Sequence, residues 1–444
     1  MDLAGLTVRI AQPHVRHGDP AVTSDDPSRL SIHACLFDAL VRREKHGRFR
    51  PGLAESWTLS EDARTWTFEL FGARFSDGRP LKATHVVDAL VRVRDEHIEG
   101  ELGTSGVIRG YLQESEIDGS GSSVRIRTPE PLADLLDLLV DLPISRDGIG
   151  TGPYRLEASG DDRVLLERVA GRGPEKLEFV AVADRGEREQ ADADIATDVS
   201  PSAGSVRAPT TVCTTFLCNL SAGPCSSRPF RRALNWATDV GALIDSAVGG
   251  AGVPVRGPWT ARHLGYDDSL PPYGHRPDEA RRLLEESGAD REVTLDVPEQ
   301  LPDESRHLAS RLAEMWVEVG ITTRVNVHQD RPAYALMVRD KRIQDAACFD
   351  SSPSSTFRLL WEKFHSGNRG PWWQGYDNPE LNRIVNRARA TASLPARERL
   401  YREAFRLLHS DAPWVFLYSP QRCFRVSDAL RDWRPSPDGY AIFH

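Results

Sequence analysis

Residues 51–80 read PGLAESWTLSEDARTWTFELFGARFSDGRP, and this stretch decides the fold that we expect of the chain. Within it, residues 65–70 alternate between polar and apolar types, which predicts a strand with one buried face. The pair Asp77-Gly78 predicts a tight turn, because these residues tolerate the positive φ angles that such turns require. A helix is expected next, with Thr84 as its N-cap residue. Its apolar face should consist of Val86, Val87, Leu90 and Val91.

Length and composition set the class of protein. A chain of 444 residues exceeds one ordinary hydrophobic core, so two or three lobes are expected. The chain is 40% hydrophobic and 27% charged, as globular proteins usually are. Its net charge of −9 argues against nucleic acid as a partner. No apolar run is long enough to predict a membrane-spanning helix.

Periodicity and turn residues predict further elements outside this stretch. The first strand is expected over residues 7–11, and a hairpin turn over residues 118–123. Residues 184–210 are rich in Asp, Ala, Ser and Pro, which is typical of a loop. Helical periodicity predicts helices over residues 132–139, 230–248, 278–287, 305–319, 379–391 and 395–409, the last with Ser393 as its cap.

Several short sequence patterns follow one another in the order that one family shows, from about residue 7 to the end. Besides residues 51–80, they are Gly150-Thr-Gly-Pro-Tyr-Arg-Leu156, Pro229-Phe-Arg-Arg-Ala-Leu234, Pro277-Asp-Glu-Ala-Arg-Arg-Leu-Leu284, Val319-Gly-Ile321, Tyr376-Asp-Asn-Pro-Glu-Leu381 and Asp411-Ala-Pro-Trp414. Together they resemble the family 5 extracellular solute-binding proteins, the peptide- and nickel-binding components of ABC importers.

This resemblance implies an α/β fold of the periplasmic-binding-protein-like type II, with two lobes, a hinge and an inserted third lobe. The first lobe would be discontinuous and built from residues 1–29, 148–220 and 419–444. The inserted lobe would cover residues 30–147, and the second, ligand-gripping lobe residues 221–418. Crossovers near residues 218–222 and 416–420 would form the hinge, whose closure buries a ligand.

Asp350 is the first ligand-binding candidate that the resemblance implies. It lies where peptide-binding members have an aspartate that pairs with the α-amino group of the peptide. A carboxylate in a dry cleft gains strongly from an ammonium partner. The alternative is that Asp350 caps a turn before Pro353. The cations just upstream, Arg339, Lys341 and Arg342, are more typical of a solvated cluster than of a clamp for a ligand carboxylate.

Aromatic residues supply the second set of candidates. Trp373 follows Trp372 in a loop between helices, and Tyr418 lies at the second expected crossover. Flat aromatic surfaces suit the walls of a cleft that accepts varied side chains, although ordinary packing between lobes would explain them equally well. Phe349 and Ser24 complete the ligand-binding candidates.

The patterns of common enzymes are missing from the sequence. It contains no GxSxG elbow, no P-loop and no HExxH, so we expect no catalytic residue, no cofactor and no metal. His14 and His17 could hold a metal, but histidines near a terminus are usually solvated. The spacing of the cysteines does not favour zinc. We expect buried free thiols, and one disulfide is the alternative in an exported protein, among Cys35, Cys213, Cys218, Cys225, Cys348 and Cys423.

The resemblance therefore implies a binding protein and not an enzyme. It would capture a small amine-bearing ligand, such as a short peptide or peptide-like molecule, for an ABC permease and ATPase, as a monomer outside the cytoplasm and associated with the membrane. Residues 1–10 show neither a signal peptide nor a lipid-accepting cysteine. Either a signal was removed, or the chain is a cytoplasmic homologue that has become a biosynthetic enzyme or a ligand sensor.

Overall fold

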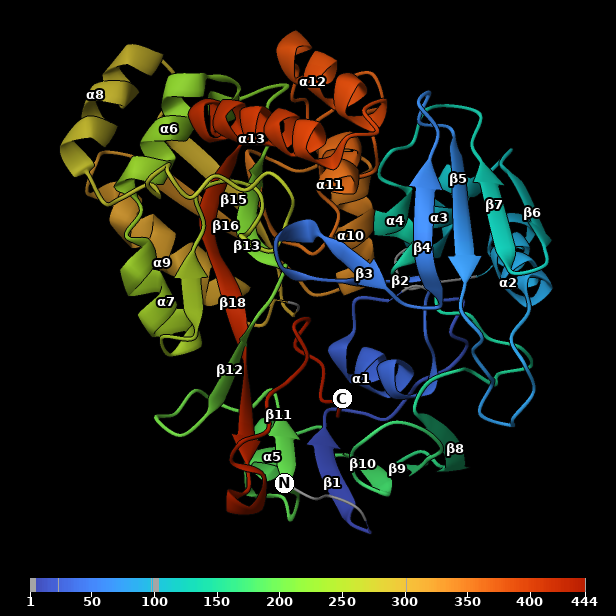
Figure 1. The fold of residues 1–444 in the computed structure, drawn as a ribbon. Helices are drawn as coiled ribbons and strands as arrows, with labels where there is room; N and C mark the ends of the chain where they lie inside the picture. The colour runs from blue at the N-terminus through green and yellow to red at the C-terminus, as the bar shows by residue number, and fades with distance from the viewer. Residues whose placement is uncertain (1–4, 23, 97, 99–103, 301, 444) are drawn as a thin grey trace. The chain divides into compact units, whose positions relative to one another are not determined.

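The computed structural model describes residues 5–22, 24–96, 98, 104–300 and 302–443. The chain forms two compact units, one of Met1–Pro209 with Arg422–His444 and the other of Thr210–Gln421. Figure 1 labels their helices and strands. The expectations for residues 1–4 and 99–103, at the start of the chain and within the inserted lobe, lie outside the described residues. The division into three lobes stays a prediction.

The first unit contains a mixed sheet with the strand order β18-β11-β1-β10-β9-β8. Strand β1 pairs in parallel with both β10 and β11, and its apolar residues Val8 and Ile10 enter the core. This confirms the first predicted strand. The elements here are β1 (Thr7–Gln12), α1 (Pro27–Leu36), β8 (Tyr154–Ser159), β9 (Arg163–Arg168), β10 (Lys176–Ala181) and β11 (Ile195–Thr197).

A second sheet of this unit contains strands from residues 51–80. Its order is β4-β5-β7-β6. Trp66, Phe68 and Leu70 are buried on alternate positions of β5, and Gly78 has a φ of 87°, so the predicted strand and turn are both confirmed. The elements are β4 (Ala54–Leu59), β5 (Thr65–Leu70), α2 (Ala83–Asp95), β6 (Glu116–Ser120) and β7 (Ser123–Arg127), with β2 (Val41–Arg43), β3 (Phe49–Pro51), α3 (Thr104–Leu112) and α4 (Leu135–Leu139) beside them in sequence.

The predicted N-cap of helix α2 was wrong. The helix begins at Ala83 with Lys82 as its N-cap, so Thr84 lies inside the first turn. His85 instead provides a hydrogen-bond acceptor at the start of the helix, because its Nδ1 accepts the backbone N–H of Lys82 at 3.1 Å. The buried face consists of Ala83, Val86, Leu90 and Val93, while Val87 and Val91 are only partly buried.

The predicted loop over residues 184–210 was also wrong. It contains α5 (Arg185–Gln190), β11 and β12 (Val206–Pro209). The buried guanidinium of Arg188 donates hydrogen bonds to the carbonyl oxygens of Val182, Ala183, Thr197 and Asp198. These bonds order a polar segment whose strands are too short to show a period in the sequence.

The second unit is built on a sheet with the order β16-β15-β17-β13-β18. Strands β15, β16 and β17 run parallel, whereas β13 is antiparallel to both β17 and β18. The carboxyl ends of the three parallel strands therefore meet at one edge, which we call the carboxyl edge. The strands are β13 (Cys213–Cys218), β14 (Gly252–Pro254), β15 (Glu292–Pro298), β16 (Thr322–His328), β17 (Ala346–Ser351) and β18 (Trp414–Val426), of which the last continues into the first unit.

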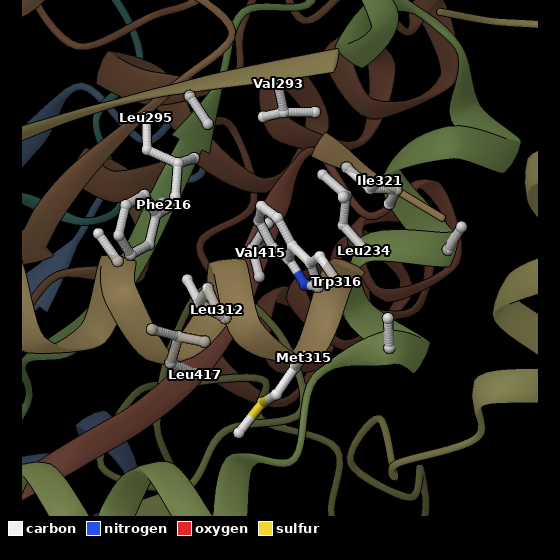
Figure 2. Packing of buried hydrophobic residues seen from close by; sticks show 14 of the residues in the cluster. Phe216, Leu234, Val293, Leu295, Leu312, Met315, Trp316, Ile321, Val415 and Leu417 are labelled. Atoms are coloured by element: carbon white, nitrogen blue, oxygen red, sulfur yellow. The ribbon is translucent and has the colours of Figure 1, made fainter. Parts of the chain in front are cut away.

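Helices cover both faces of this sheet. Figure 1 shows α7 and α9 on one side of the strands and α11 on the other. On the first side, Trp316 of α9 packs among Phe216, Leu312 and Val415 (Figure 2). The helices are α6 (Arg228–Ala237), α7 (Val240–Val248), α8 (Pro277–Ser287), α9 (Ser305–Val317), α10 (Arg331–Arg339), α11 (Thr356–Lys363), α12 (Pro379–Arg389) and α13 (Leu394–Asp411).

The helix predicted over residues 230–248 is two helices. The break falls at Thr238 and Asp239, where the Asp239 side chain caps α7 by accepting the N–H of Ala242 at 3.0 Å. Thr238 also accepts the indole N–H of Trp316 at 3.1 Å, which fixes the break against the core. The other predicted helices of this unit are confirmed to within a few residues, whereas α10 and α11 were not predicted.

Candidate functional site

Asp350 lies near the end of β17, at the carboxyl edge. Thr214 of β13 is its direct neighbour across the ladder, and Thr214 Oγ1 donates a hydrogen bond to Asp350 Oδ1 at 2.8 Å. Tyr418 of β18 is the neighbour of Thr214 on the other side. Side chains that are opposite each other in adjacent strands share a face of the sheet. The structure thus brings Asp350 and Tyr418, two of the predicted residues, into one row with Thr214 between them.

The turn after Asp350 has other partners. His263 Nε2 lies 2.8 Å from the carbonyl oxygen of Pro353. The next helix, α11, is capped by Ser355, whose Oγ accepts the N–H of Arg358 at 3.1 Å. Asp350 accepts a hydrogen bond from Thr214 of the adjacent strand. The sheet therefore holds the Asp350 carboxylate through Thr214, while the roles of amine anchor and turn cap both stay predictions.

Tyr418 does not offer a free aromatic surface. Its side chain is fully buried in the core of the second unit, and its hydroxyl donates to Glu304 Oε1 at 3.0 Å. Burial raises the pKa of the Tyr418 hydroxyl, and the nearby Glu304 and Asp350 carboxylates raise it further. The hydroxyl consequently stays protonated and serves as a donor. Glu304 and Thr214 were not predicted, because neither lies in a family pattern.

Phe349 contacts a different set of groups from Asp350, because successive strand residues point to opposite faces. Its ring lies 5.0 Å from that of Trp372, and Lys363 Nζ lies 4.8 Å from its centre. Lys363 is buried and donates to Ser351 Oγ at 2.8 Å. An ammonium over an aromatic face is a favourable arrangement. No signal in the sequence distinguishes this lysine from an ordinary helical one.

Trp373 contacts other residues of its own loop. Its indole N–H donates to the carbonyl oxygen of Tyr376 at 2.7 Å, and the Arg369 guanidinium lies 5.3 Å from its ring centre. Trp372, its neighbour, is the tryptophan that contacts Phe349. A role for Trp373 in binding stays a prediction.

Ser24 belongs to the first unit. Its Oγ accepts the N–H of Asp26 at 3.1 Å. Asp26 is the N-cap of α1 and also lies 2.6 Å from His14 Nε2. Ser24 therefore lies in the turn that leads into α1. His17 contacts the carbonyl oxygen of Val15, and no three potential metal ligands gather anywhere in the described part of the chain.

The cations upstream of Asp350 contact other protein groups. Lys341 Nζ donates to the carbonyl oxygens of Arg339, Gly370 and Pro371 at 2.6–3.1 Å. Partial burial lowers the pKa of Lys341, with Arg339 as a further cause. Lys341 thus ties α10 to the loop that follows α11.

All six cysteines are free and buried. Burial raises the pKa of the Cys213 thiol to about 12, with the Asp350 carboxylate adding to the effect and Lys363 opposing it. A thiol with such a pKa is a poor nucleophile. Across the described residues, we find no helix with both the length and the apolar character needed to cross a bilayer.

The fold is that of the type II periplasmic binding proteins, as predicted. The nickel ABC transporter structure from Bacillus halodurans superposes with a TM-score of 0.81 at 20% identity, over 98% of each chain. The sequence itself matches bacterial extracellular solute-binding proteins, family 5 Middle, over residues 48–182 and 175–358. This protein belongs to that family.

Relatives of known name are binding proteins. A probable D,D-dipeptide-binding periplasmic protein from Escherichia coli (strain K12) is 24% identical over 466 residues, covering 90% of this chain and 86% of the relative. A glutathione-binding protein from Pectobacterium atrosepticum is 22% identical over 465 residues, covering 95% of this chain and 90% of that protein. The sequence resemblance to family 5 is therefore confirmed, and the ligand is the open question.

Proposed function

We propose that this protein captures a small amine-bearing ligand, such as a short peptide or peptide-like molecule, at the carboxyl edge of the second unit and delivers it to an ABC importer. Asp350 would receive the amino group of the ligand. The observation that carries the proposal is the Thr214–Asp350 hydrogen bond, which fixes a carboxylate at the end of a central strand. Ligands of open α/β sheets bind outside the carboxyl ends of the strands.

The chemistry follows from the partners of Asp350. Thr214 donates to Oδ1 and orients the carboxylate. An ammonium group that binds there forms a charge-assisted hydrogen bond, which is stronger than a neutral one. The names of the dipeptide- and glutathione-binding relatives support an amine-bearing ligand, and their being binding proteins supports reversible capture without turnover. The relatives give no support to a repurposed enzyme or sensor.

Calorimetry on the purified protein tests the proposal. Dipeptides with a free amino terminus should bind, whereas the same dipeptides with an acetylated terminus should bind at least about 30-fold more weakly, because acetylation removes the ammonium charge. The matched control is amidation of the carboxyl terminus, which leaves the amino group intact. Equal affinity for the free and acetylated forms would exclude an amine anchor, and no binding of any peptide would overturn the proposed ligand class.

A further inference from the structure

The loops that follow the three parallel strands bring charged residues from distant parts of the sequence to the carboxyl edge. Glu304 lies in the segment between β15 and α9, Arg331 is the first residue of α10, which follows β16, and Asp350 is near the end of β17. The parallel pairing of β15 with β16 and with β17 places all three at the same edge. Asp350 therefore shares the proposed binding edge with a second carboxylate.

Both carboxylates are held by hydroxyl groups of neighbouring strands. Thr214 donates to Asp350 at 2.8 Å, and Tyr418 donates to Glu304 at 3.0 Å. Thr214 and Tyr418 are directly opposite each other in the ladder. Because the Tyr418 side chain is fully buried, its hydroxyl has little freedom to move. The two acceptors are consequently oriented by one rigid pair of strands.

Glu304 has the chemistry of a binding group and lacks the usual structural roles. It occupies the N-cap position of α9, yet its side chain forms no capping hydrogen bond. Among the described residues, no arginine, lysine or histidine lies within ion-pair distance of Glu304. Its neighbour in the same loop, Glu299, is by contrast paired with Arg306 at 3.0 Å. A carboxylate without a cation, oriented by a buried hydroxyl, is suited to a positively charged ligand group.

Cations also lie in this region. The Arg331 guanidinium comes from α10 and lies 5.9 Å from the ring centre of Tyr334. Arg331, Asp350 and Glu304 all act electrostatically on the Cys348 thiol, so they share one neighbourhood. Lys363 and Asp350 both act on the Cys213 thiol, so a buried ammonium also lies near Asp350. Coulomb attraction in a partly buried site then favours a cationic ligand group at Glu304, the carboxylate without a cation among the described residues.

We propose that Glu304 is a specificity-determining residue that binds a second cationic group of the ligand, so that the site selects ligands with two amino groups, such as peptides that begin with lysine. The inference rests on the proposed function, in which Asp350 holds the first amino group. Tyr418 acts through Glu304 as a positioning residue.

The test compares two dipeptides that differ in one charge, lysyl-alanine and norleucyl-alanine, by calorimetry. The wild-type protein should bind lysyl-alanine roughly tenfold more tightly or better. Glu304→Gln should bring the ratio of the two affinities to about one while the affinity for norleucyl-alanine stays within about twofold. Tyr418→Phe removes only the orienting hydroxyl and should lower the ratio partway. Glu299→Gln, the matched control in the same loop, should leave the ratio unchanged.

The outcomes separate this inference from the function on which it rests. If both dipeptides bind the wild type equally, or if Glu304→Gln keeps the preference for lysine, the inference is wrong and the amine anchor at Asp350 stands. If neither dipeptide binds, both fail. Melting temperatures of the variants confirm that they fold, and Tyr418→Phe provides a second test of the ratio should Glu304→Gln prove unstable.

Discussion

Replacing Asp350 with asparagine changes one charge and almost no shape, which makes it the sharpest test of the proposed site. Losing one partner of a buried charged pair costs about 2–5 kcal/mol. The affinity for a dipeptide should therefore fall roughly 30-fold or more. Asparagine still offers an oxygen to Thr214 Oγ1, so the free energy of unfolding should change by less than about 1 kcal/mol.

Thr214→Val supplies the second arm of a double-mutant cycle. It removes the hydroxyl that orients Asp350 but leaves the carboxylate charge in place. A hydrogen bond to a charged acceptor contributes about 1.5–3 kcal/mol, and we expect the lower end because Asp350 is only partly buried. Affinity should fall about tenfold, which is less than for Asp350→Asn. Once Asp350 is asparagine, the effect of Thr214→Val on binding should shrink, because the two residues act as a unit.

Calorimetry and thermal unfolding of the wild type, Asp350→Asn, Thr214→Val and the double variant test whether the two residues act together in binding. Additive losses in affinity would mean that Thr214 does not act through Asp350. An Asp350→Asn variant with unchanged affinity but a stability lower by about 1 kcal/mol would identify a turn cap and remove Asp350 from the site.

Three further predictions concern a helix cap, a buried histidine and a buried thiol beside the site. Asp239→Ala should cost about 1 kcal/mol in urea unfolding because it removes the cap of α7, while Ser393→Ala, at an N-cap without a side-chain bond, should cost far less. Burial lowers the pKa of His33 to about 4, below its ordinary 6.5, so the unfolded state binds the extra proton first. The free energy of unfolding of the wild type relative to that of His33→Gln should be highest above pH 6.5, and this difference should fall by up to about 3 kcal/mol as the pH falls to 4. A difference that does not vary with pH would contradict the lowered pKa. Cys213, whose pKa is raised to about 12, should resist a thiol reagent at pH 8 in the folded protein and react after unfolding in urea, whereas rapid labelling of the folded protein would show that the thiol is accessible.

Local patterns determined much of the secondary structure. The alternation over residues 65–70 predicts β5 because a half-buried strand needs a period of two, and the pair Asp77-Gly78 predicts the turn because glycine accepts a positive φ. The order of the short sequence patterns along the chain was also enough to identify the family, because that resemblance does not depend on how the chain folds. Local signals failed where side chains from elsewhere intervene. The carbonyl bonds of Arg188 order residues 184–210, and Asp239 divides a single helical period into two helices.

In the candidate site, too, the sequence identified individual residues, and only the structure showed which residues they contact. Asp350 was identified from the sequence, because its surroundings match a family pattern. Thr214, Glu304 and Tyr418 are 136, 46 and 68 residues away from it along the chain. Only strand register brings Thr214 next to both Asp350 and Tyr418, and only the packing of α9 against the sheet brings Glu304 to the Tyr418 hydroxyl. Sequence spacing determines which face of one strand a residue occupies, whereas pairing between strands, which depends on the whole core, determines its neighbours.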